Sequence, residues 1–334
     1  MPTNVSYATD SDTRLETLVL HILPSFGLTG DGILNTNGLT AALNMKGAKE
    51  VVDGGLEFWH GVEKEESSNF KTQGKNDDMT ANVQDPLDRL RYDPKIITNS
   101  IVVNDLDKAM NRGRAAVKNL VKSYRRQATT TIKNGFNSLW WKGTPGANDP
   151  DSIPSTIPTS ATTGSIGGLT RAGKTYIQHG VDSTTLADIG SEAGITRLEQ
   201  NRLQFAVGQE TADIIVMSQS KFANMVGYLS TLQRLRPNDK LAQLRINSIQ
   251  LGTAVIVFEN TNVLGGANTI NDGRIYGISS QATIIKTLAG GDGVWSTQFE
   301  RLGLKLNKAI FWKWFGNLVT NNPRANWVMT DVTA

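Results

Sequence analysis

The chain of 334 residues contains no cysteine, which excludes disulfides, zinc–thiolate sites and thiol nucleophiles. Its three histidines, His21, His60 and His179, lie far apart, with no carboxylate or second histidine at the spacing of a metal site. No apolar run approaches the ~20 residues of a transmembrane helix, and the first apolar stretch, residues 15–23, follows acids rather than a cationic cluster. We expect a protein made in the cytoplasm, without metal, membrane span or signal peptide.

Common catalytic motifs are also missing. The sequence has no G-x-S-x-G elbow, no H-E-x-x-H helix and no EF-hand loop. The adjacent acids at 65–66 and 77–78 stand in a polar stretch, where no apolar neighbours would tune a carboxyl group for acid–base catalysis. We therefore predict no catalytic residue, no cofactor-binding residue and no metal ligand, and we do not expect an enzyme.

One segment does match a phosphate-binding motif. Gly168-Leu-Thr-Arg-Ala-Gly173-Lys174-Thr175 fits the P-loop pattern G-x-x-x-x-G-K-[ST]. That motif needs a hydrophobic strand directly before its first glycine and a helix directly after its threonine. Residues 158–167 are instead rich in Ser, Thr and Gly, and the residues that follow soon reach another glycine. The context predicts an ordinary loop, and a nucleotide-binding protein using Lys174 and Thr175 is an alternative.

Charge is unevenly distributed, although the net charge is only +3. Residues 50–93 hold eleven acids against five bases, whereas residues 108–142 hold nine bases and no acid. An acidic segment and a basic helix can pair between subunits, or the helix can face a polyanion such as nucleic acid. Both segments can also be solvated surface, because exposed ion pairs contribute little to stability.

Hydrophobic periodicity predicts helices at residues 12–23, 36–45, 104–141, 195–207 and 219–232. Strands are predicted at residues 212–217 and 253–258 and within residues 274–286 and 294–315. Residues 56–62 and 96–103 flank a long polar stretch and are predicted to form a two-stranded arm. The Pro-, Ser- and Thr-rich residues 143–168 are predicted to be a surface loop.

The strongest of these signals is the long helix. Its apolar positions recur every three or four residues, and Asn104 or Asp105 is a suitable N-cap. At 1.5 Å per residue, about 37 residues give a helix of about 55 Å, with bends expected at Gly113 and Gly135.

Tryptophan is the last compositional signal, with seven residues in the chain. The clusters at 140–141 and 311–315 place aromatic side chains on both faces of short segments. One face of such a segment can be covered by a neighbouring subunit. Alternatively, both faces fill the interior of the chain, as large aromatic side chains mostly do.

Several short motifs support one resemblance when they are taken together. They are Phe58-Trp59 before the polar stretch, Gln84-Asp85 and Tyr92-Asp93 after it, Leu139-Trp140-Trp141-Lys142-Gly143 at the end of the long helix, and Ile166-Gly167-Gly168-Leu169-Thr170-Arg171. Together with the order of elements, which covers nearly the whole chain, they resemble the major capsid proteins of tailed bacteriophages, the Hong Kong phage capsid fold family. Residues 172–176 depart from the family, whose members continue this loop with aromatic residues.

The resemblance implies an α+β Hong Kong phage-type major capsid fold. Its expected parts are an N-terminal arm (residues 1–49), an extended β-hairpin loop over a neighbouring subunit (50–103), a peripheral domain (104–189) with its spine helix (104–141), an α/β axial domain (190–260), and return strands completing the peripheral domain (261–334). The axial domains would meet at the centres of pentamers and hexamers.

The function implied by the resemblance is that of a coat protein in a virion, assembled in the host cytoplasm. Copies of the chain would form an icosahedral shell around dsDNA, which touches the inner face non-specifically. Residues 1–15 leave no room for the cleaved assembly domain of many relatives, so a separate scaffolding protein is expected beside the portal. The alternatives are an encapsulin-like nanocompartment around protein cargo, the P-loop protein described above, and a peripheral nucleic-acid-binding module using the basic helix.

Eight residues are candidate contacts between subunits. The acids of the loop, which we expect to dock on bases of an adjacent subunit, are Glu63, Glu65 and Glu66. Their expected partners on the long helix are Lys118, Lys122, Arg125 and Arg126, which otherwise would line a wall facing DNA. Trp59 is the expected aromatic contact.

Overall fold

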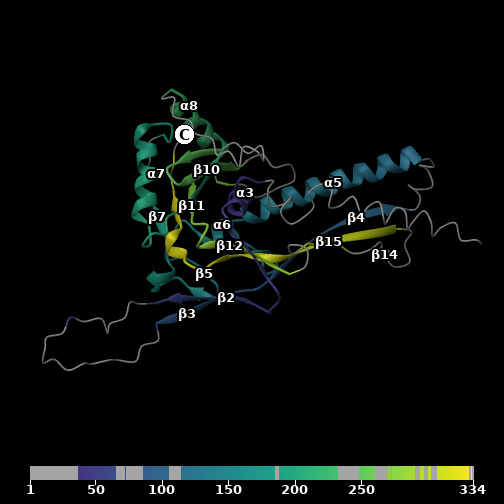
Figure 1. Cartoon of the computed structure of the whole chain (residues 1–334), viewed down its shortest axis with the longest axis horizontal. Coiled ribbons are helices and arrows are strands. Elements are labelled where there is room, and N and C mark those ends of the chain that lie inside the picture. Colours follow the sequence, from purple (N-terminus) through teal and green to yellow (C-terminus); the bar gives the residue numbers. More distant parts are fainter. Residues whose placement is uncertain are drawn as a thin grey trace, which may run out of the picture.

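The computed structural model describes residues 37–64, 72, 86–104, 114–184, 188–231, 248–259, 270–271, 273–289, 294–296, 300–301, 307–330 and 332. These residues form a mixed α+β fold with two six-stranded sheets and two small two-stranded ones (Figure 1). The predicted helix at residues 12–23 lies outside the described residues.

The first large sheet carries the long helix. Its strands are β1 (Lys49–Val52), β4 (Lys95–Asn104), β12 (Thr283–Leu288), β13 (Val294–Ser296), β14 (Glu300–Arg301) and β15 (Asn307–Thr320). All pairs are antiparallel except β1 with β12. Helix α5 (Arg114–Trp140) runs beside β4 and β15 toward the same end of the molecule (Figure 1).

Helix α5 is held on this sheet by a stripe of apolar side chains. Ala128, Ile132, Phe136 and Trp140 recur every fourth residue, so they share one helix face, and all are buried. The Phe136 ring meets the Trp314 ring edge to face at 5.1 Å between centroids, a geometry that adds to the stabilisation from burial. The stripe explains why the predicted helix forms here and which face it buries.

The predicted start of this helix is partly wrong. Asn104 is the last residue of β4 and therefore no helix cap, while residues 105–113 lie outside the described part. The described helix has 27 residues and is about 40 Å long at 1.5 Å per residue. Gly135 lies inside it.

The second large sheet is buried on both faces. Its order is β7 (Gly180–Asp182), β16 (Trp327–Met329), β11 (Ile275–Ile278), β8 (Ile214–Ser218), β10 (Ala254–Glu259) and β9 (Ser248–Leu251). Ile214 and Val216 pack with α3 (Gly38–Met45) in one core cluster. Ile215 and Met217 pack with α7 (Glu192–Gln204) and α8 (Gln219–Thr231) in another. A strand that is covered on both sides is a continuous apolar run in the sequence, as β8 is. The strand predicted at residues 212–217 is therefore confirmed, and so are the predictions of α3, α7, α8 and β10.

The two strands of the predicted arm do not pair with each other. Strand β2 (Phe58–Glu63) pairs with β3 (Leu87–Tyr92), whereas β4 pairs with β15 through ten consecutive residues. The prediction that residues 56–62 pair with 96–103 is therefore wrong. Asp93-Pro94 separates β3 from β4, and proline cannot continue a strand ladder, so the chain leaves the hairpin there and starts a strand of the first sheet.

The predicted surface loop at residues 143–168 is partly interior. It contains α6 (Ile153–Thr156), whose Ile153 is fully buried. The Ser152 side chain caps this short helix by accepting a hydrogen bond from the Ser155 N–H at 3.3 Å. The segment ends in a small hairpin of β5 (Ser165–Ile166) and β6 (Leu169–Thr170), before the 3-10 helix η1 (Thr175–Ile177).

Most tryptophans fill the interior. Trp140, Trp141, Trp312, Trp314 and Trp327 are all at most 5% exposed. Trp59 is 61% exposed, and the Trp295 side chain lies outside the described part. The interpretation as core is thus confirmed for five of the seven, and Trp59 stays a candidate contact.

Candidate assembly surfaces

The β2–β3 hairpin lies at the lower edge of the body, away from the end toward which α5, β4 and β15 extend (Figure 1). Its inner face packs against the body through Phe58, Val62 and Leu90, which are buried in one cluster with Ile166. Residues of the outer face alternate with these, as the strand period requires. The hairpin therefore has one side fixed to the chain and one side open.

The open face combines aromatic, apolar and charged side chains. Trp59 is opposite Arg91 and Glu63 is opposite Leu87 in the strand register; Leu87 is 56% exposed, and Glu63 is exposed. The Arg89 guanidinium lies 5.0 Å from the centre of the Trp59 ring, a cation–π contact that holds the indole in place. Aromatic residues and arginine are typical of protein–protein interfaces.

The base of the hairpin is attached to the β5–β6 turn. The Arg91 N–H donates to the Gly167 carbonyl at 2.9 Å. Gly167 has a φ of +52°, and a Cβ there would lie 2.7 Å from the Leu90 Cβ. Only glycine allows this approach, because any other residue would be strained at this positive φ and its Cβ would collide with Leu90.

Asp88 of β3 binds the segment that matched the P-loop pattern. Its carboxylate accepts hydrogen bonds from the Tyr176 hydroxyl at 2.7 Å and from Lys174 Nζ at 3.3 Å. The Tyr176 hydrogen bond is the main cause that lowers the pKa of Asp88 to about 2. Thr175 starts a 3-10 helix of three residues, so the long helix of a phosphate cradle is missing here. Lys174 is engaged within the chain.

Behind this segment, Arg171 ties three stretches of backbone together. Its buried guanidinium donates to the carbonyls of Ile177 and Thr156 and to His179 Nδ1 at 2.9 Å. Because arginine only donates, Nδ1 must accept, so Nε2 carries the proton and donates to the Pro158 carbonyl. Burial, and then the Arg171 charge, lower the pKa of His179 to about 4.

Of the two other histidines, one lies within the described part of the chain. His60 lies on β2, where burial and then Lys286 lower its pKa, and His21 is outside the described residues. Within the described residues, no group of three or more acids or histidines could hold a metal ion. The same part of the chain has no helix that is long and apolar enough to cross a membrane.

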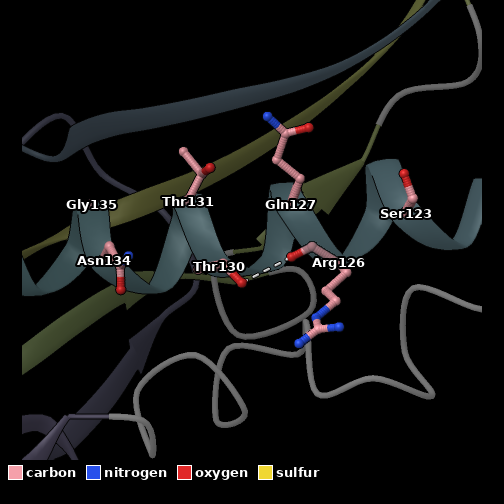
Figure 2. Close-up of a pocket in the computed structure, with 7 residues that line it drawn as sticks. All are labelled: Ser123, Arg126, Gln127, Thr130, Thr131, Asn134 and Gly135. Atoms are coloured by element: carbon pink, nitrogen blue, oxygen red, sulfur yellow. Dashed lines mark hydrogen bonds between the residues drawn. The ribbon is translucent and has the colours of Figure 1, made fainter. Parts of the chain in front are cut away.

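A second surface is the polar face of α5. An open depression of about 530 Å³ lies along the helix, and Figure 2 shows the residues that line it. The side chains and the glycine that line it are Ser123, Arg126, Gln127, Thr130, Thr131, Asn134 and Gly135. The Thr130 hydroxyl donates to the Arg126 carbonyl at 3.0 Å, and the Arg126 side chain extends away from the helix (Figure 2). This face has no carboxylate and no large apolar side chain, so it differs in character from the hairpin.

The candidate contacts fall on both surfaces. Glu63 and Trp59 lie on the open face of the hairpin, and Arg126 lies on the polar face of α5. Lys118, Lys122 and Arg125 belong to α5, but their side chains are outside the described part, as are Glu65 and Glu66. The hairpin and the helix extend away from each other (Figure 1), so among the described side chains Glu63 and Arg126 are not brought together within one chain.

Sequence reasoning missed the residues that attach the hairpin. The Ile-Gly-Gly-Leu-x-Arg motif did mark Gly167 and Arg171, though without their role. Asp88 and Tyr176 gave no signal, because two residues 88 positions apart meet only through the tertiary fold.

No protein-family model matches the chain, and no curated protein matches its sequence. Among solved structures, it is similar to a chain of the cyanophage A-1(L) capsid, with a TM-score of 0.59 and 10% identity over 87% of this chain and 93% of that one. The capsid of an empty GTA particle gives a TM-score of 0.52 at 9% identity over 86% and 89%. The cyanophage P-SCSP1u capsid gives 0.51 at 12% identity over 86% of each chain. The chain thus has the mixed α+β fold of Hong Kong phage-type capsid structures, as predicted.

Proposed function

We propose that this chain is the major capsid protein of a tailed bacteriophage, a structural component of the virion rather than an enzyme. The observation that carries the proposal is the likeness to a cyanophage capsid subunit over 87% of the chain. A fold alone does not give a function, so the surfaces of this chain have to fit the same role.

The open face of the hairpin fits self-assembly. Strand β4, which starts beside the hairpin and runs away from it, carries a second exposed apolar pair, Ile96 and Val102. Two different exposed surfaces on one chain favour a head-to-tail contact, and such a contact closes into rings when the rotation permits. Pentamers and hexamers are rings of this kind.

The proposed division of the chain follows the capsid plan. Residues 50–103 include the hairpin that overlies a neighbour, residues 104–189 and 261–334 form the peripheral domain around α5, and residues 190–260 form the axial domain. Several strands are exceptions to this plan. Strand β4 pairs with β15 in the first sheet, and β7, β11 and β16 lie in the second sheet with β8 and β10 of the proposed axial domain. Residues 1–49 are the proposed N-terminal arm, of which α3 packs on the second sheet.

The acids and bases are proposed to meet between copies. Because the hairpin and α5 extend away from each other, Glu63 can reach Arg126 only in a neighbouring subunit, and the same contact is proposed for Glu65, Glu66 and the other bases of α5. Charge reversal of Lys118 and Lys122 together, to glutamate, should therefore reduce shell yield strongly, as measured by sedimentation. Normal shells from this double variant would contradict the proposed pairing of acids and bases. They would favour the alternative in which the bases of α5 line a wall that faces DNA.

Further partners follow from the same proposal. A scaffolding protein and a portal would direct closure, and packaged dsDNA would touch the inner face non-specifically. The basic helix suits such a contact, because Lys and Arg bind phosphates regardless of sequence.

Negative-stain electron microscopy of the purified protein, alone and with its scaffolding partner, tests the proposal. Closed icosahedral particles, or pentamers and hexamers, are the expected result. Particles filled with protein cargo would favour an encapsulin-like compartment instead. A protein that stays monomeric and binds ATP, and whose ATP binding is abolished by the Lys174→Ala substitution, would overturn the proposal in favour of the P-loop alternative.

A further inference from the structure

The two linkers of the β2–β3 hairpin differ. Asp93-Pro94 ties β3 closely to β4 of the first sheet, whereas Gly54 and Gly55 join β1 to β2 with φ values of 152° and 132°. Such values are open to glycine at little cost and restrain the chain weakly. Beyond the short connection to β4, the direction of the hairpin therefore depends on contacts made by its base.

Those contacts come mainly from one segment, residues 165–177. We propose that this segment, called the clamp below, fixes the direction of the hairpin and thereby selects one shell geometry. The inference rests on the proposed function, because it concerns how the hairpin is presented to a neighbouring subunit. It also gives Lys174 a role that does not involve nucleotide.

The clamp holds β3 at three residues. The Asp88 carboxylate binds Tyr176 and Lys174, Leu90 packs against Gly167, and the Arg91 N–H binds the Gly167 carbonyl. An ionic, an apolar and a backbone contact along one strand oppose rotation of the hairpin about different axes. A single contact would leave the hairpin free to swing.

The clamp itself is anchored from behind. Arg171 is fully buried and holds the carbonyls of Ile177 and Thr156. It also holds His179, whose other nitrogen binds the Pro158 carbonyl. Tyr92, the last residue of β3, adds a hydrogen bond to the Thr320 carbonyl at 2.8 Å. The β3 strand is thus linked through the clamp to α6, and directly through Tyr92 to β15 of the first sheet.

Two variants test the clamp: Asp88→Asn, which removes the charge and keeps the shape, and the double variant with Lys174→Met and Tyr176→Phe. Hydrogen exchange of the β3 amides is measured on unassembled subunits, and shell diameters are measured by cryo-electron microscopy. We expect the Arg91 amide to exchange at least tenfold faster in both variants, with the amides of β8 unchanged. Shells should change from one diameter to a mixture.

Lys46→Met is the matched control. It removes an ion pair with Asp213 of similar exposure, far from the hairpin, so exchange at Arg91 and shell diameter should not change. Asp88→Glu should restore slow exchange, which separates a positioning role from general loss of structure. The unfolding midpoint of each variant shows whether the body is still folded.

Unchanged exchange at Arg91 in both variants would overturn the clamp. Faster exchange with a single, normal shell diameter would overturn its role in assembly. If the unmodified chain forms no shells, the proposed function fails, while the exchange measurement still decides whether the clamp holds the hairpin.

Discussion

The second sheet and the β2–β3 hairpin are built from strands of similar length but differ in what covers them. Every residue of β8 is buried between two layers of helices. The hairpin buries one face only, and Trp59 on its other face is 61% exposed. The sheet is complete within one chain, whereas the hairpin lacks a cover that a second chain can supply. Stability and assembly are therefore separable, and substitutions in the two regions should separate them.

The largest effect on folding is expected in the core. Trp140→Ala removes a side chain that is 1% exposed and packs edge to face on Trp314. The free energy of unfolding should fall by about 3–5 kcal/mol, because a cavity remains beside α5. Urea denaturation of the unassembled subunit measures this. A loss below about 1 kcal/mol would contradict the assignment of this stripe to the core.

A smaller effect on the free energy of unfolding is expected from the protonation of His179 at low pH. Its pKa is lowered in the folded chain, from 6.5 to about 4, so protonation favours the unfolded state. The stabilising contribution is complete above pH 6.5 and is lost as the pH falls toward 4. Between pH 7 and pH 5 the free energy of unfolding should drop by roughly 1–2 kcal/mol from this group.

Denaturation curves at both pH values check this prediction. His179→Gln retains a hydrogen-bonding side chain that does not titrate, so the variant should lose this part of the pH dependence. An unchanged pH dependence in the variant would show that another group is responsible.

The smallest effect on folding is expected at the hairpin surface. Trp59→Ala removes an exposed indole and its contact with Arg89, and the subunit should lose no more than about 1 kcal/mol, the strength of an exposed cation–π pair. Shell yield should nevertheless fall at least tenfold, because aromatic residues at the centre of an interface carry much of its binding energy. Sedimentation measures the yield, and Leu203→Ala, which truncates an equally exposed side chain on α7, is the matched control. Equal yields from the two variants would place the interface elsewhere.

The fold could be predicted where local pattern decides it. The stripe of Ile132, Phe136 and Trp140 predicts the long helix, and the apolar run at 214–217 predicts a doubly covered strand. The pairing of β2 with β3 could not be read in the same way, because Leu87 on the open face and Asp88 on the inner face interrupt the alternation in residues 87–92. The clamp was visible only as a glycine-rich motif, whose match to a P-loop suggested a different chemistry.

By itself, the sequence determined the fold class, the long helix, the buried strands and the absence of thiol chemistry, since each of these depends on composition or on spacing along one segment. Only the tertiary structure decided which strands pair, that five tryptophans fill the core, and that Asp88 meets Tyr176 and Lys174. Such contacts join residues distant in sequence, and their energy depends on the distance between side chains after folding, which no local pattern records.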